Sequence, residues 1–179
     1  DEGRRTALDV VGRVSSAISI PLGVGGGIRS VDDIGRVLDA RASKVCINTA
    51  AVRNPELLQV ASDAFGAERI ISAIDASAAT AAYPDAMDSD GSGSGRWVVR
   101  ACGGKQRTHL DLIEWSRAVE RLGVGEILLT SVDRDGATDG YDLRQLRAVT
   151  EAVSIPVIAS GGAGSLEHFR DAFTEGGAD

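Results

Sequence analysis

Hydrophobic positions along the chain follow two alternating periods, which predict a regular series of strands and helices. Short apolar runs, typical of strands buried on both faces, are separated by stretches in which apolar residues recur every three or four positions. The expected strands cover residues 19–24, 44–48, 69–75, 126–133 and 155–160, and a further short strand is expected at residues 97–100. The expected helices cover residues 5–17, 111–122, 142–153 and 166–175, with two more that begin near residues 31 and 55. This alternation is typical of a parallel sheet covered by helices.

One segment breaks the alternation. Residues 76–95 are rich in Ala, Ser, Gly and Asp and show neither period. We expect them to form a flexible surface loop inserted between two strands.

A repeated stretch of sequence favours a closed barrel over an open sheet. Residues 19–32 and 154–167 share a Ser-Ile-Pro start, a glycine pair and a serine before the next helix. Their separation corresponds to about four strand–helix units, since eight units take about 250 residues in a (β/α)8 barrel. We therefore expect residues 1–179 to form part of one α/β (β/α)8 (TIM) barrel. This part would hold about five of the eight strands. An open doubly wound sheet is the alternative.

Composition and charge narrow the possible functions by exclusion. The formal net charge of −7 counts against a surface for nucleic acid or an anionic membrane. The sequence has no apolar run near the ~20 residues that a membrane span needs. Cys46 and Cys102 are too few for a disulfide scaffold and lack metal-site spacing. We expect a cytoplasmic protein with reduced thiols.

The two glycine turns are candidate ligand sites. Gly26–Gly27 and Gly161–Gly162 each follow a strand and precede a helix with a serine cap. Glycine lets the backbone approach a ligand, and the next helix offers N–H groups and a positive dipole end to a phosphate. Two such turns half a barrel apart suggest an elongated ligand with a phosphate at each end. Ordinary strand-to-helix turns are the alternative.

Polar residues end several strands, at the face where barrel active sites lie. Asp75 ends an apolar strand and is placed to act as a general acid or base, or else as a structural cap. Asn48 and Thr49 suit phosphate binding or the positioning of a carboxylate, or else a turn. Asp133 and Asp135 lie on one side of a strand end, where they could bind a metal or belong to a solvated loop.

Charged residues also open two strands, at the opposite face. Lys44 and Glu126 occupy these positions, where a charged side chain usually closes the bottom of a barrel. Cys46 is expected to be a small buried side chain, and His168 a structural residue of the last helix.

Six motifs give the chain a specific resemblance to a known family. They are residues 24–30 (VGGGIRS), 44–52 (KVCINTAAV), 73–76 (AIDA), 126–136 (EILLTSVDRDG), 139–142 (DGYD) and 158–169 (IASGGAGSLEHF). Together they resemble the cyclase subunits of imidazole glycerol phosphate synthase, from histidine biosynthesis. The phosphoribosyl-formimino isomerases of the same pathway share the barrel and both phosphate sites. They normally carry Gly in place of Asn48, which favours the cyclase.

The resemblance implies a reaction and a partner. A glutaminase subunit supplies ammonia, which passes through the barrel and attacks a phosphoribulosyl-formimino aminoimidazole carboxamide ribonucleotide. The products are imidazole glycerol phosphate and an aminoimidazole carboxamide ribotide, and neither metal nor cofactor takes part. Asp75 matches one of two catalytic aspartates. The resemblance places the second on strand 1, and it implies that this sequence holds strands 3–7 and lacks strands 1, 2 and 8. We therefore expect the chain by itself to be inactive.

The resemblance also assigns binding residues. Gly27, Asn48 and Thr49 match one phosphate site. The other site is matched by Asp135, Gly136 and Gly162. Lys44 and Glu126 match part of a charged gate through which ammonia enters. A departure from the family pattern lies at Thr108-His109, where the family usually has Thr-Gly. The alternatives are the sister isomerase and a non-catalytic phosphate-binding barrel.

Overall fold

The computed structural model describes residues 2–79 and 96–179, with side chains from residue 8 onward. Five parallel strands form its continuous sheet, in the order β1, β2, β3, β6, β7. They are β1 (Gly23–Gly25), β2 (Lys44–Ile47), β3 (Ile70–Ala78), β6 (Glu126–Ser131) and β7 (Val157–Ser160). Spatial order follows chain order, as in a barrel, whereas a doubly wound sheet reverses its order at a switch point. The predicted partial (β/α)8 barrel is therefore confirmed.

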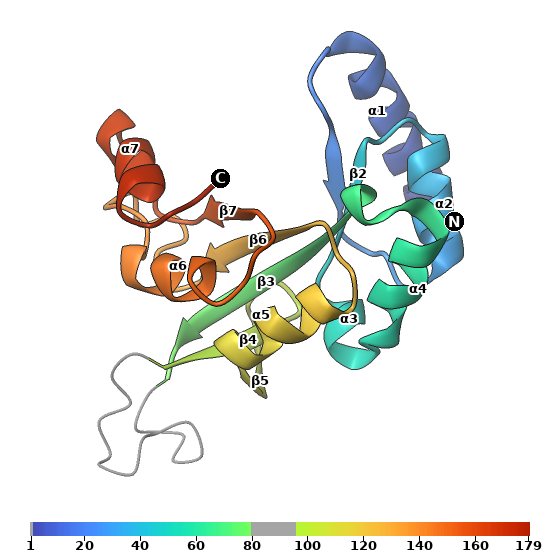
Figure 1. Cartoon of the computed structure of the whole chain (residues 1–179). Helices are drawn as coiled ribbons and strands as arrows, with labels where there is room; N and C mark the ends of the chain where they lie inside the picture. The colour runs from blue at the N-terminus through green and yellow to red at the C-terminus, as the bar shows by residue number, and fades with distance from the viewer. Residues whose placement is uncertain (1, 80–95) are drawn as a thin grey trace.

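Helices connect the strands and cover the outer side of the curved sheet (Figure 1). They are α1 (Glu2–Ala17), α2 (Val31–Asp39), α3 (Thr49–Arg53), α4 (Glu56–Phe65), α5 (Leu112–Arg121), α6 (Leu143–Thr150), α7 (Leu166–Thr174) and the 3-10 turn η1 (Ala67–Arg69). The expected serine caps are present, because the side chains of Ser30 and Ser165 accept hydrogen bonds from backbone N–H groups of α2 and α7. The short helix α3 was not predicted. None of the helices in the described residues is long and apolar enough to cross a membrane.

Alternation along the strands separates a core face from an inner face. Val45, Ile70, Ile74 and Ile127 are fully buried and belong to the core cluster that the helices cover. Within each strand, the residues at the alternate positions point to the inner face of the barrel. That inner face carries Lys44 and Cys46 on β2, Ala73 and Asp75 on β3, and Glu126 and Leu128 on β6.

A β-hairpin interrupts the repeating strand–helix pattern after β3. It consists of β4 (Trp97–Ala101) and β5 (Gln106–Asp111), and β4 pairs antiparallel with the end of β3, Asp75–Ala78. β3 pairs with β6 along one edge. Along its other edge, β3 pairs with β2 near its start and with β4 near its end. The turn of the hairpin thereby contacts the start of α3, where the backbone N–H of Cys102 donates to Thr49 Oγ1.

The hairpin corrects the predicted start of the inserted loop. Ala76–Ala78 belong to β3, although the sequence pattern placed a loop over residues 76–95. Pairing with β4 buries Ala76 and Ser77, and this long-range contact outweighs their weak strand propensity. The remainder of that expected loop, residues 80–95, lies outside the described residues. β5 was not predicted either.

Two glycine substitutions test the packing of this fold. A Cβ at Gly164 would overlap the backbone carbonyl of Thr138, so we expect Gly164→Ala to destabilise the protein by about 1–3 kcal/mol. At Gly35, within α2, the added Cβ would lie 3.6 Å from the Phe65 ring, an ordinary contact. Gly35→Ala should stabilise the protein by about 0.5–1 kcal/mol, because alanine loses less conformational freedom on folding. Urea unfolding measures both, and equal stabilities would contradict the packing described.

Candidate functional site

A pocket of about 900 Å³ opens at the carboxyl ends of β1, β2 and β3. It is lined by the glycine turn Gly25–Gly27, by Asn48 and Thr49 directly after β2, and by Asp75 within β3. The other lining residues that matter here are Gly23, Cys46, Ala73 and Leu128 of the inner face, and Arg29, Arg53, Cys102 and Gly103. The structure therefore brings Asp75 and the first predicted phosphate-binding set, Gly27, Asn48 and Thr49, into one cavity. These residues come from three successive strand–helix units.

Asp75 lies in this pocket with a hydrogen-bonded carboxylate. Burial raises the pKa of the Asp75 carboxyl above its ordinary value, and the nearby negative charge of Asp135 acts in the same direction. Hydrogen bonds from the side chain of Asn48 and the backbone N–H of Gly104 lower the pKa and offset part of the rise. A carboxyl with a raised pKa holds its proton closer to neutral pH, which suits a general acid or base.

The side-chain amide of Asn48 is oriented by this contact. An amide nitrogen donates and an ionised carboxylate accepts, so the NH₂ group faces Asp75. The amide oxygen, Oδ1, is buried and has no hydrogen-bond partner among the described residues. Buried polar atoms are normally paired. Asn48 therefore positions the carboxylate with one end and can accept a hydrogen bond from a ligand with the other.

The turn of the β4–β5 hairpin closes one side of the pocket. The backbone N–H of Cys102 donates to Thr49 Oγ1 at 2.9 Å, and Arg53 Nη2 lies 3.7 Å from Cys102 Sγ. The φ of Cys102 is 56°, a left-handed conformation that is unusual for a residue with a side chain. The turn thus contacts both Thr49 and, through Gly104, Asp75.

The charges that line the pocket favour an anionic ligand. Two guanidinium groups, Arg29 and Arg53, line it, and Asp75 is its one carboxylate among the residues described. This local excess of positive charge stands out in a chain with a net charge of −7. Neither arginine was predicted from the sequence. The spacing of Thr49 and Arg53, four residues apart in a helix, was the signal that could have indicated Arg53.

The second predicted phosphate-binding set lies elsewhere in the described structure. Asp135, Gly136 and Gly162 belong to the β6–α6 and β7–α7 connections and do not line the 900 Å³ pocket. Gly162 is packed against the chain itself: its carbonyl accepts from Gly140 N at 2.8 Å, and a Cβ there would overlap the Gly140 carbonyl. At Gly27 and Gly136, by contrast, a Cβ would meet nothing within 4 Å. The two halves of the repeat thus differ in local environment.

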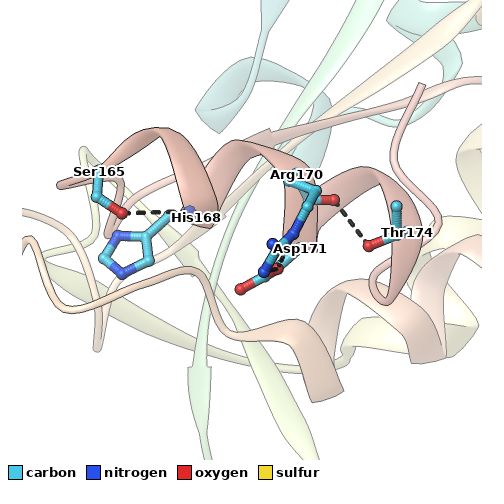
Figure 2. Close-up of polar contacts among 5 residues, drawn as sticks. All are labelled: Ser165, His168, Arg170, Asp171 and Thr174. Carbon is cyan, nitrogen blue, oxygen red and sulfur yellow. Dashed lines mark hydrogen bonds and ion pairs between the residues drawn. The ribbon is translucent and has the colours of Figure 1, made fainter.

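Other polar residues of these connections have structural contacts. Asp133 Oδ2 accepts a hydrogen bond from Ala78 N at 2.7 Å, which fixes the end of β3. His168 Nδ1 accepts from Gly164 N at 3.0 Å. Figure 2 shows the α7 contacts, with the cap from Ser165 to His168 N at one end and the Arg170–Asp171 ion pair further along the helix. In the described chain, no group of three or more His, Cys, Asp or Glu could hold a metal.

The opposite end of the inner face holds an ion pair. Lys44 Nζ contacts Glu126 Oε1 across the start of β3, at the amino ends of β2 and β6. Burial raises the pKa of the neighbouring Cys46 thiol, and Glu126 raises it further, while Lys44 acts against the rise. The predicted gate residues are therefore in contact, at the end of the barrel opposite Asp75.

Comparison with known proteins identifies relatives over the whole chain. The family model described as "Histidine biosynthesis protein" matches residues 1–179. The chain is 51% identical to "Imidazole glycerol phosphate synthase subunit HisF" of Myxococcus xanthus (strain DK1622), over 99% of this chain and 65% of that protein. It is 49% identical to the subunit of the same name from Geobacillus thermodenitrificans (strain NG80-2), over 99% of this chain and 66% of that protein. The chain therefore spans slightly less than two thirds of the length of these curated relatives.

The raised pKa of Asp75 predicts a pH-dependent effect on stability. Since the folded state binds this proton more tightly than the unfolded chain, the stabilisation is full below the unfolded-state pKa and is lost as pH rises through the folded-state pKa. Asparagine cannot ionise. We therefore expect the free energy of unfolding of Asp75→Asn, relative to wild type, to increase from acid to neutral pH.

Urea unfolding between pH 4 and pH 8 measures this difference. Asp63→Asn, at an exposed position of α4, removes the same charge from the surface and is the matched control. A difference for Asp75→Asn that stays constant or shrinks as the pH rises would contradict the prediction.

Proposed function

This chain belongs to the histidine biosynthesis protein family, and from that premise we propose that it is part of the cyclase of imidazole glycerol phosphate synthase. In this proposal, residues 1–179 supply strands three to seven of a single barrel domain. The reaction uses ammonia to convert the phosphoribulosyl-formimino aminoimidazole carboxamide ribonucleotide into imidazole glycerol phosphate and aminoimidazole carboxamide ribotide. The names and the identity of the two curated relatives support this assignment.

One observation supports the proposal: Asp75 shares a pocket with the predicted phosphate-binding residues Gly27, Asn48 and Thr49 and with two arginines. Asp75 acts as a general acid or base during attack by ammonia and ring closure. Asn48 holds the Asp75 carboxylate, and its free Oδ1 accepts a hydrogen bond from the substrate. In the sister isomerases a glycine normally replaces this asparagine, and glycine has no amide for this contact. The Asn48–Asp75 contact therefore favours the cyclase.

The substrate's two phosphates define the ends of the bound molecule. One phosphate contacts Gly27, Asn48 and Thr49, where the glycine turn leaves the backbone open. The other lies at Asp135, Gly136 and Gly162. The open backbone at Gly136 supports this second site, while Gly162 shapes it by allowing the close contact with Gly140. No metal or organic cofactor takes part.

Ammonia comes from a glutaminase subunit in a cytoplasmic heterodimer. The word "subunit" in the names of both relatives supports an assembly of this kind. The partner binds at the amino ends of the strands, and the Lys44–Glu126 ion pair controls the entry of ammonia into the barrel. The ion pair lies on the inner face at the end opposite Asp75, as such a path requires.

Ammonium-dependent turnover by the native enzyme tests the reaction. We expect consumption of the bisphosphorylated substrate to require ammonium chloride when no glutaminase is present. Asp75→Asn should lower the turnover at least ~100-fold, because general acid–base catalysis contributes about 10²–10⁴-fold. Asp63→Asn is the control. A folded native enzyme with no ammonium-dependent turnover would favour the isomerase or a non-catalytic barrel.

The gate is tested by comparing two sources of ammonia. Lys44→Met removes the cation and leaves Glu126 unpaired. We expect turnover coupled to glutamine hydrolysis to fall relative to turnover with added ammonium chloride, because ammonium from solution can reach the pocket through its open mouth. Arg36→Met, on the exposed surface of α2, is the control. Equal losses with both sources would argue against a gate.

A further inference from the structure

We propose that Arg53 binds a substrate phosphate and sets the affinity of the glycine-turn end of the pocket. This inference rests on the proposed function, because it assigns one more residue to the same bisphosphate site. Its starting observation is that Arg53 lines the pocket together with Gly27 and Thr49.

The position of Arg53 follows from the short helix α3. Thr49 is the first residue of α3 and Arg53 is the last, four residues later. Residues four apart lie on the same face of a helix, so their side chains project in the same direction. Thr49 lines the pocket, so this spacing directs Arg53 toward the pocket as well. Arg53 is indeed among the lining residues.

The guanidinium group is held in place without being neutralised. Its hydrogen-bond contact in the described structure is with the thiol of Cys102, at 3.7 Å from Nη2 to Sγ. Sulfur is a weak acceptor, and a thiol carries no compensating charge. In the same turn, the backbone N–H of Cys102 is bonded to Thr49 Oγ1. The hairpin turn therefore orients Arg53 beside Thr49 while leaving its charge available to a ligand.

The chemistry of the group matches a phosphate. A guanidinium presents several N–H donors in a planar fork, which can bond two phosphate oxygens at once. Arg53 is exposed at the edge of the pocket, so its guanidinium group is accessible to a phosphate that enters from solvent and binds at the glycine turn. Arg29 supplies a second positive charge at the same end. The ligand class is thus a phosphate monoester, the group that each end of the proposed substrate carries.

Phosphate binding by the native protein is the first test. Titration of inorganic phosphate, followed by calorimetry, compares wild type with Arg53→Ala, Arg53→Lys and Arg69→Ala. Arg69 is exposed on η1, away from the pocket lining, and is the matched control for loss of one positive charge. We expect Arg53→Ala to weaken binding about tenfold or more and Arg53→Lys to weaken it less, with Arg69→Ala unchanged. Wild-type affinity in Arg53→Ala, or no phosphate binding by wild type, would overturn the inference.

Kinetics of the native enzyme separate this inference from the proposed function. Because Arg53 contacts a part of the substrate remote from the reacting atoms, Arg53→Ala should raise KM about tenfold with kcat within about twofold. An unchanged KM with ammonium-dependent turnover intact would overturn the role of Arg53 and leave the cyclase assignment standing. Phosphate binding that depends on Arg53, in an enzyme without ammonium-dependent turnover, would instead sustain the phosphate contact and reject the cyclase.

Discussion

The parallel arrangement of the strands is the constraint on which the rest of the structure depends. Each helix returns the chain to the same edge of the sheet, so all five parallel strands point in the same direction. Residues that end strands therefore meet at one rim, and residues that begin strands meet at the other. Asp75 and Asn48 lie at the first rim, and Lys44 and Glu126 form their ion pair at the second. The alternation of side chains along the strands places Asp75, Lys44 and Glu126 on the inner face, and Asn48 follows β2 directly.

The parts of the fold that follow from local periodicity were predictable from the sequence. Apolar runs and helical spacing identified the five parallel strands and most helices, and the serine caps at Ser30 and Ser165 were visible as residue types. The hairpin was only half predicted, because β5 contains polar residues and gains its structure from pairing with β4. The end of β3 was missed for the same reason: β4 pairs with Ala76 and Ser77, and Ala76 also pairs with Ser131 of β6.

The residues of the candidate site were also predicted only in part. Asp75, Asn48 and Thr49 were predictable because the carboxyl-terminal part of each strand in a parallel sheet lies at a known rim, although β3 continues three residues beyond Asp75. Arg53 and Cys102 were not, since their meeting depends on where the hairpin turn packs against α3. The two glycine pairs have similar sequences but different surroundings in the structure. Gly27 opens toward the pocket, whereas Gly162 accommodates the backbone of Gly140, because different loops surround the two turns.

The turn of the β4–β5 hairpin contacts both the proposed phosphate site and the proposed catalytic carboxylate. Cys102 N–H is bonded to Thr49, beside the proposed phosphate contact, and Gly104 N–H is bonded to the Asp75 carboxylate two residues further along the same turn. A phosphate that displaced the turn, or added its negative charge nearby, would alter the proton affinity of Asp75. Thermodynamic reciprocity then requires the protonation of Asp75 to alter phosphate affinity by the same factor. A phosphate bound as proposed would therefore be heterotropically coupled to the protonation of Asp75 through a single backbone turn.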